Sequence, residues 1–308
     1  MNPAPLTIAG VTFHVVATGF TPPSRVPAEA GFAAARPRHA REVVLEAGRI
    51  DVVAGLGACP LPEGRLIVDS GALWTMHAAP GGYLLSFRRA GREVYKTAAC
   101  DAGTTRAAVT FEASLHARER AGGAAVSPED PLNYPLDQLL LMNHLAPRGG
   151  FILHGGGVAL DDGGVAFAGV SGAGKSTLAR SFIAAGLEAA LLSDERVVLR
   201  RGTEGWTVWG TPWPGDAQVA RNAGAPLRAL VFLVHAARDR LVRLSPAEAA
   251  RRLFPAISCP WYDRERLLPV LAACDSIVGD VPCYALEFAP GPAAAELVCG
   301  LVPGVPSA

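Results

Sequence analysis

Lysine is almost absent from this chain of 308 residues. Of its 28 basic residues, only Lys96 and Lys175 are lysines, and the formal net charge is zero. A balanced charge argues against a nucleic-acid partner, because nucleic-acid-binding proteins usually carry a basic face. At position 175 the chain uses lysine, although nearly all of its other basic residues are arginine. The compact ammonium of lysine suits a tight phosphate site better than a planar guanidinium does.

Long apolar runs and clustered cysteines are missing as well. No stretch approaches the roughly 18 apolar residues of a membrane-spanning helix, and the first residues lack the basic and apolar segments of a signal peptide. We therefore expect a cytoplasmic protein without a membrane partner. The six cysteines form no C-x-x-C pair, which favours free thiols and small core residues over a zinc site or a disulfide framework.

The chain is long enough for two domains, and half of its residues are hydrophobic. Residues 1–125 are expected to form a β-rich N-terminal domain, since short strand-like runs alternate there with Gly and Pro clusters. No catalytic constellation is found in this part, so we interpret it as a candidate substrate-recognition domain. Its expected strands are 43–46, 66–68, 83–87 and 107–111, with a hairpin turning near residues 90–91.

Residues 126–308 are expected to form an α/β domain with a mixed sheet. Its pattern predicts a helix at 137–145 and then a hairpin. The hairpin consists of the runs 151–154 and 158–160, a turn at 161–164 and a strand at 164–168 that leads into a glycine-rich loop. Ser245, Pro246 and Glu248 together predict a helix start with a capping box. The other expected strands are 189–192, 196–199, 206–209, 227–234 and 283–288, and the other expected helices are 177–185, 246–257, 264–275 and 292–301.

Residues 169–176 match the P-loop pattern G-x-x-x-x-G-K-[ST] at every fixed position. Glycines allow successive backbone N–H groups to surround phosphate oxygens, and the following helix adds the positive end of its dipole. Lys175 can then reach the β- and γ-phosphates, and the Ser176 hydroxyl can ligate Mg²⁺. ATP and Mg²⁺ are therefore expected. The candidate nucleotide-binding residues are Gly169, Ser171, Gly172, Ala173, Gly174, Lys175, Ser176 and Thr177.

Asp194 and Glu195 follow the expected strand at 189–192. They come 19 residues or more after Lys175, an interval that one helix and one strand can fill. Because α/β sheets place ligand groups at the carboxyl ends of their strands, we expect both carboxylates beside the P-loop. An acid there can hold Mg²⁺ or accept a proton from an attacking hydroxyl.

Three classes of nucleotide-binding protein could show this pattern. Transport ATPases place their acidic strand far downstream, after a motif that is lacking here. Small-molecule kinases of the shikimate type begin at the P-loop, which lies past the midpoint of this chain. The ordered set of His154-Gly155, the P-loop, residues 193–197 and Arg221-Asn222 instead resembles the catalytic domain of HPr kinase/phosphorylase, over about residues 135–290.

This resemblance implies a fold related to the nucleotide core of phosphoenolpyruvate carboxykinase. It implies transfer of the γ-phosphoryl group to a Ser or Thr hydroxyl of a protein or peptide, and it allows a homo-oligomer, since the family forms hexamers. Asp194 would be the base, and Glu195, together with Asp194, would help to hold the magnesium. Arg221 would stabilise the transferring phosphoryl group, and His154 would contact phosphate or tune Asp194. Lys175→Ala and Asp194→Ala are then expected to abolish transfer without unfolding the protein.

The chain also departs from the family. Glu195 replaces a second aspartate, and a turn at 210–215, which contains Trp213, stands where the family has a Glu-Ile-Arg-Gly stretch. Trp213 could cap the nucleotide or anchor the core. The first 130 residues do not resemble the family's N-terminal domain, so HPr itself is not the expected acceptor. A small-molecule hydroxyl kinase on the same scaffold and a non-catalytic nucleotide-binding regulator stay open as alternatives.

Overall fold

A computed structural model describes residues 4–23, 32, 38–39, 47–71, 73–89, 93–121, 130–169 and 172–302. It is a mixed α/β structure in which strands predominate, as expected. Its contacts divide the chain into two units. The N-terminal unit comprises Met1–Leu6, Val11–Arg25 and Ala47–His144, and the C-terminal unit comprises Thr7–Gly10, Val26–Glu46 and Leu145–Ala308. The division thus falls at the end of a helix, later than the interdomain boundary inferred from the sequence.

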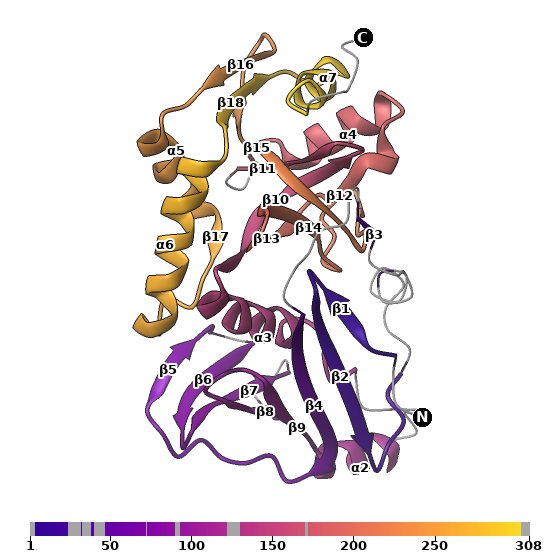
Figure 1. The fold of residues 1–308 in the computed structure, drawn as a ribbon. Coiled ribbons are helices and arrows are strands. Elements are labelled where there is room, and N and C mark those ends of the chain that lie inside the picture. Colours follow the sequence, from indigo (N-terminus) through magenta and orange to yellow (C-terminus); the bar gives the residue numbers. More distant parts are fainter. Residues whose placement is uncertain are drawn as a thin grey trace. The chain divides into compact units, whose positions relative to one another are not determined.

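An eight-stranded sheet has the order β1-β2-β4-β9-β8-β7-β6-β5 (Figure 1), and all of its strands except β1 lie wholly in the N-terminal unit. Strands β2, β4 and β9 run parallel, whereas β9 to β5 form an antiparallel meander. The expected strand at 43–46 and the hairpin tip at 90–91 lie outside the described residues. The elements are β1 (Leu6–Ile8), β2 (Val11–Thr18), β4 (Gly48–Gly57), β5 (Leu66–Asp69), β6 (Trp74–Ala79), β7 (Gly82–Arg88), β8 (Val94–Asp101), β9 (Arg106–Glu112), α2 (Ala113–Ala121) and α3 (Leu136–Leu145).

Two long strands organise the sheet of the C-terminal unit, β10 (Gly150–Leu160) and β15 (Ala223–His235). Strand β10 pairs with β13 (Arg196–Gly202) up to residue 154 and with β11 (Gly163–Ala168) from residue 155 onward. Strand β15 pairs first with β14 (Gly205–Gly210) and then, in parallel, with β11. Since β13 also pairs with β14, the strands β11, β10, β13, β14 and β15 close into a ring.

The remaining elements largely follow the expected pattern. The capping box at Ser245 is confirmed with both of its hydrogen bonds. The helix that it opens ends at Leu253, earlier than expected, because a 3₁₀ turn with Pro255 follows. The elements are β3 (Arg38–His39), β12 (Leu191–Ser193), β16 (Arg240–Arg243), β17 (Ile257–Ser258), β18 (Cys283–Phe288), α4 (Lys175–Ala184), α5 (Pro246–Leu253), α6 (Arg264–Asp280) and α7 (Ala293–Cys299), with 3₁₀ turns at 146–148, 188–190 and 254–256.

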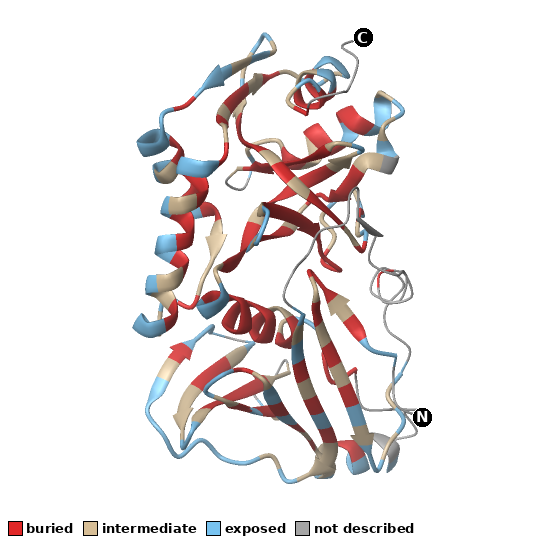
Figure 2. Cartoon of the chain, in the orientation of Figure 1, coloured by how far each residue is buried: buried red, intermediate tan, exposed pale blue. Residues whose placement is uncertain are grey.

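The parallel strands of the C-terminal unit are buried on both faces (Figure 2). Strand β11 shows how the alternation of side chains achieves this. Phe167 packs with Leu178 and Phe182 of α4, whereas Ala166 packs in the cluster that contains Ile277 of α6. The apolar face of α4 is thereby fixed against the strand that precedes it. No helix in the described part of the chain is long and apolar enough to cross a membrane.

Candidate functional site

Three consecutive glycines mark the point where β10 changes partners. A Cβ atom on Gly156 would lie 2.3 Å from the Phe167 ring and 2.6 Å from the Ser193 carbonyl oxygen. Only glycine therefore allows β12 and β11 to approach the strand this closely. The backbone N–H of Gly155 donates to the Glu195 carbonyl oxygen at 2.9 Å. His154, the last residue before the change of partner, is thus held next to Glu195.

The P-loop has the expected setting between β11 and α4. Gly172 and Gly174 adopt φ values of 80° and 101°, in the left-handed region that favours glycine, and Gly174 is the N-cap residue of α4. Lys175 is only 7% exposed, and its Nζ donates to the Gly169 carbonyl oxygen at 3.1 Å. Ala173, Ser176 and Thr177 are partly exposed around it. Ser171 lies outside the described residues.

His235 supports the P-loop, a role that the sequence interpretation missed. Its Nε2 donates to the Gly172 carbonyl oxygen at 2.6 Å. Its ring stacks on Phe288, with centroids 6.1 Å apart and an interplanar angle of 19°. A Cβ on Gly174 would lie 2.8 Å from Phe288 Cζ, so the loop rests directly on this pair. The available signal was position, since His235 ends the central strand at the carboxyl edge where the P-loop also lies.

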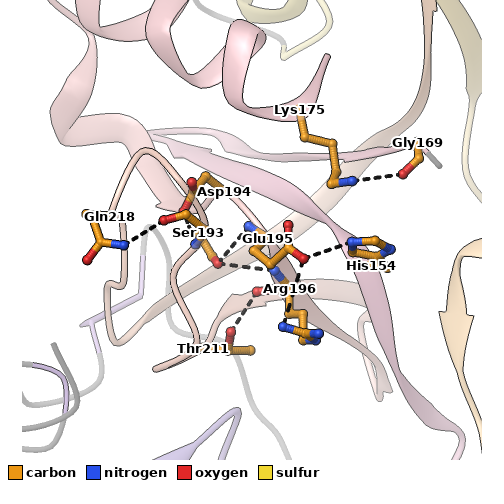
Figure 3. Close-up of polar contacts among 10 residues, drawn as sticks. His154, Gly169, Lys175, Ser193, Asp194, Glu195, Arg196, Thr211 and Gln218 are labelled. Carbon is orange, nitrogen blue, oxygen red and sulfur yellow. Dashed lines mark hydrogen bonds and ion pairs between the residues drawn. The ribbon is translucent and has the colours of Figure 1, made fainter. Parts of the chain in front are cut away.

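Asp194 is fully buried and holds the loop that follows β14. Its Oδ1 accepts from the backbone N–H of Gly215 at 2.9 Å and of Val219 at 3.3 Å, and its Oδ2 accepts from Ala217 at 2.7 Å. Both oxygens are therefore engaged, and Figure 3 shows the carboxylate on the side of Gln218. Asp194 therefore anchors this loop, and its expected role as proton acceptor and metal ligand stays a prediction.

Glu195 is the carboxylate of the pair that faces the P-loop lysine. Its Oε1 lies 2.9 Å from His154 Nε2 and 4.0 Å from Arg196 Nη1 (Figure 3). Its Oε2 makes no hydrogen bond to any residue that the structure describes. Burial lowers the pKa of Lys175, whereas the charge of Glu195 raises it and that of Arg196 lowers it. Glu195 is therefore close enough to Lys175 to stabilise its positive charge.

His154 is held as a neutral imidazole. Burial lowers its pKa most, and the positive charge of Lys175 lowers it further, while Glu195 acts in the opposite direction. Because a carboxylate only accepts hydrogen bonds, the short contact places a proton on His154 Nε2. The imidazole therefore orients Glu195 rather than Asp194, with which the sequence interpretation had associated it.

Arg221 lies beside the carboxyl end of β12. Its backbone N–H donates to the Leu192 carbonyl oxygen at 2.9 Å. The side chain is exposed and makes no hydrogen bond or ion pair within the described part of the chain, so it can reach a ligand. Its neighbour Asn222 is buried and donates to the Phe32 carbonyl oxygen at 3.3 Å. Trp213 is 4% exposed, which favours its role as a core anchor over a nucleotide cap.

The site offers few protein ligands for a metal ion. Among the residues that the structure describes, no three His, Cys, Asp or Glu side chains gather into a metal site. Mg²⁺ nevertheless fits, because it keeps several waters and takes most of its other ligands from substrate phosphates. The Ser176 hydroxyl, partly exposed in the first turn of α4, and the Glu195 carboxylate are oxygen donors of the required kind.

No protein-family model matches the chain, and no curated protein matches it significantly. We therefore infer the function from the geometry of these side chains.

Proposed function

We propose that the chain is an ATP- and Mg²⁺-dependent kinase that transfers the γ-phosphoryl group to a Ser or Thr hydroxyl of a protein or peptide. In this proposal it is a divergent relative of HPr kinase/phosphorylase, with a nucleotide core related to that of phosphoenolpyruvate carboxykinase. One observation carries the proposal. Lys175 at the P-loop, Glu195 after β12 and His154 on β10 meet at one edge of the sheet, which supplies a cation for phosphates beside a carboxylate that an acceptor hydroxyl can approach.

Each side chain has a role that follows from its position. The P-loop amides and Lys175 bind the phosphates, and the limited exposure of Lys175 strengthens this interaction because the local dielectric is low. His154 holds Glu195 Oε1, so that Oε2 accepts the proton from the acceptor hydroxyl as its oxygen bonds to the γ-phosphorus. The bond from the γ-phosphorus to the bridging oxygen breaks in the same transfer, and ADP leaves. Arg221 stabilises charge on the transferring group. Mg²⁺, held by Ser176 and by phosphate oxygens, would neutralise charge on the β- and γ-phosphates.

Nucleotide binding is tested by isothermal calorimetry with ATP and Mg²⁺. Lys175→Met should weaken binding by about tenfold or more, because a desolvated charge-assisted contact to phosphate is lost. Arg180→Met is the matched control, since Arg180 is exposed on the same helix, and it should bind like the wild type. Equal affinities for wild type and Lys175→Met, or no binding by the wild type, would refute the proposal.

The acceptor class is tested by incubating the protein with ATP, Mg²⁺ and two separate mixtures, Ser- and Thr-containing peptides and small hydroxyl metabolites. Mass spectrometry then identifies what gains a phosphoryl group. Phosphorylated peptides support the proposal, and phosphorylated metabolites alone favour the small-molecule kinase. Tight binding of ATP with neither product would favour a regulator. Glu195→Gln serves as the control in which transfer is expected to fail while ATP still binds.

A further inference from the structure

The N-terminal unit contains a cavity of its own, far along the chain from the P-loop. Its volume is about 350 Å³, and every residue that lines it belongs to this unit. This size falls within the range of about 300 to 1,000 Å³ that is typical of small-molecule sites. Its walls are largely apolar and include Pro60, Pro62, Val94 and Leu115. Pro60 and Pro62 are exposed, so the cavity opens to solvent, and an apolar body of small-molecule size can lie against its walls.

The polar lining of this cavity includes a buried hydroxyl without a partner. Ser86, on β7, lines the cavity and is 2% exposed, and its Oγ has no hydrogen-bond partner among the described residues. Thr75 of β6 lies directly opposite Ser86 in the sheet register and is equally buried. Its Oγ1 likewise has no partner in the described part of the chain. Buried hydroxyls without partners are destabilising, and a ligand that accepts a hydrogen bond removes this cost.

The charged groups around the cavity are already paired within the protein. Arg118 Nη2 lies 3.6 Å from Glu93 Oε2. Glu112 accepts from the backbone N–H of Cys59 at 2.9 Å and from the Ser114 hydroxyl at 2.7 Å. Two carboxylates and one guanidinium leave an excess of negative charge, which disfavours phosphates and other anions. The cavity is therefore chemically unlike the nucleotide site.

We propose that this cavity binds a small uncharged molecule that has an apolar body and a group that accepts a hydrogen bond from the Ser86 hydroxyl. The apolar walls contact the body, and the Ser86 hydroxyl on β7 orients its polar end. The inference is independent of the kinase proposal, because no residue is shared between the two sites.

The probe is prodan, a neutral naphthalene ketone whose emission shifts to the blue in apolar surroundings. The full chain should bind one prodan molecule with a saturable blue shift. It should bind the anionic probe anilinonaphthalene sulfonate at least about tenfold more weakly. Leu115→Trp fills the cavity and should abolish prodan binding. Val53→Trp is the matched control, since Val53 is 53% exposed on β4, and it should leave binding unchanged.

Ser86→Ala provides a second test that does not alter the apolar walls. Loss of one hydrogen bond should weaken prodan binding by about threefold to tenfold. Since the hydroxyl has no partner among the described residues of the free protein, this variant should melt at the same temperature as the wild type or higher. Unchanged prodan affinity in Ser86→Ala or Leu115→Trp, or a sulfonate affinity equal to that of prodan, would overturn the inference.

Discussion

His154 Nε2 lies 2.9 Å from Glu195 Oε1, although 41 residues separate them in the chain. The contact arises because β10 and β13 are neighbours and pair His154 with Arg196 in register. A neutral imidazole that donates to one carboxylate oxygen fixes the orientation of the carboxylate and leaves the other oxygen for a substrate. The strand pairing thus holds an oriented carboxylate beside the P-loop.

Glu195→Gln should lower kcat for phosphoryl transfer by about 10²-fold to 10⁴-fold, the usual contribution of a general base. The amide keeps a similar size and can still contact His154, so the affinity for ATP should change little. Steady-state kinetics at several Mg²⁺ concentrations check this. An apparent Mg²⁺ affinity like that of the wild type supports proton acceptance, whereas a large loss of Mg²⁺ affinity would assign Glu195 to the metal instead.

Asp194→Ala should destabilise the protein rather than affect catalysis alone. Three backbone N–H groups would lose a charged acceptor in a buried place, so we expect the free energy of unfolding to fall by at least about 2 kcal/mol. Urea denaturation measures it. Asp216→Ala, in the same loop and exposed, is the control and should cost less than about 0.5 kcal/mol. If the Asp194→Ala protein is stable but inactive, Asp194 is the general base, as expected from the sequence.

The pH dependence of stability should show the lowered pKa of His154. The unfolded chain binds a proton near the ordinary histidine pKa of about 6.5, whereas the folded protein resists protonation. Because the unfolded state then holds more protons, the free energy of unfolding falls as the pH decreases below that value. Comparing urea unfolding of wild type and His154→Gln at neutral and mildly acidic pH checks this. The variant should lose less stability on acidification, and an equal loss would contradict the assignment.

Local sequence signals predicted the parts of the fold that depend on neighbouring residues. The strand, glycine loop and helix around Lys175 and the capping box at Ser245 are such parts. The sequence could not show which of two adjacent carboxylates faces the lysine, because successive side chains point in different directions. The surroundings of Asp194 and Glu195 differ because their partners lie far away in the sequence. Asp194 contacts the loop around residue 217, and Glu195 contacts a histidine on β10. The closure of β10 to β15 into a ring depends on such distant pairings too.

His235→Phe should weaken ATP binding by about threefold to tenfold. Phenylalanine preserves the stacking on Phe288 but cannot donate to the Gly172 carbonyl oxygen, so one hydrogen bond that fixes the loop is lost. Calorimetry with ATP and Mg²⁺ measures the change. His235→Asn retains a donor and should recover part of the affinity. Wild-type affinity in the phenylalanine variant would show that the loop does not need this support.

Gly174→Ala should impair both stability and ATP binding. The residue has φ of 101°, and its new Cβ would lie 2.8 Å from Phe288 Cζ. Gly186→Ala is the matched control for backbone strain. Its φ of 73° is also in the left-handed region, and no described atom lies within 4 Å of that Cβ. The control should lose about 1 kcal/mol of unfolding free energy, as expected for strain alone, and bind ATP normally.

Adding Phe288→Leu to Gly174→Ala separates contact from strain, because leucine has no atom at the Cζ position. If the Phe288 ring is what the introduced methyl group meets, the double variant should be less destabilised than the sum of the single changes, by about 0.5 kcal/mol or more. Urea unfolding of the four proteins gives this coupling energy. Strict additivity would mean that the cost of Gly174→Ala comes from backbone conformation alone, and that the P-loop does not rest on the end of β18.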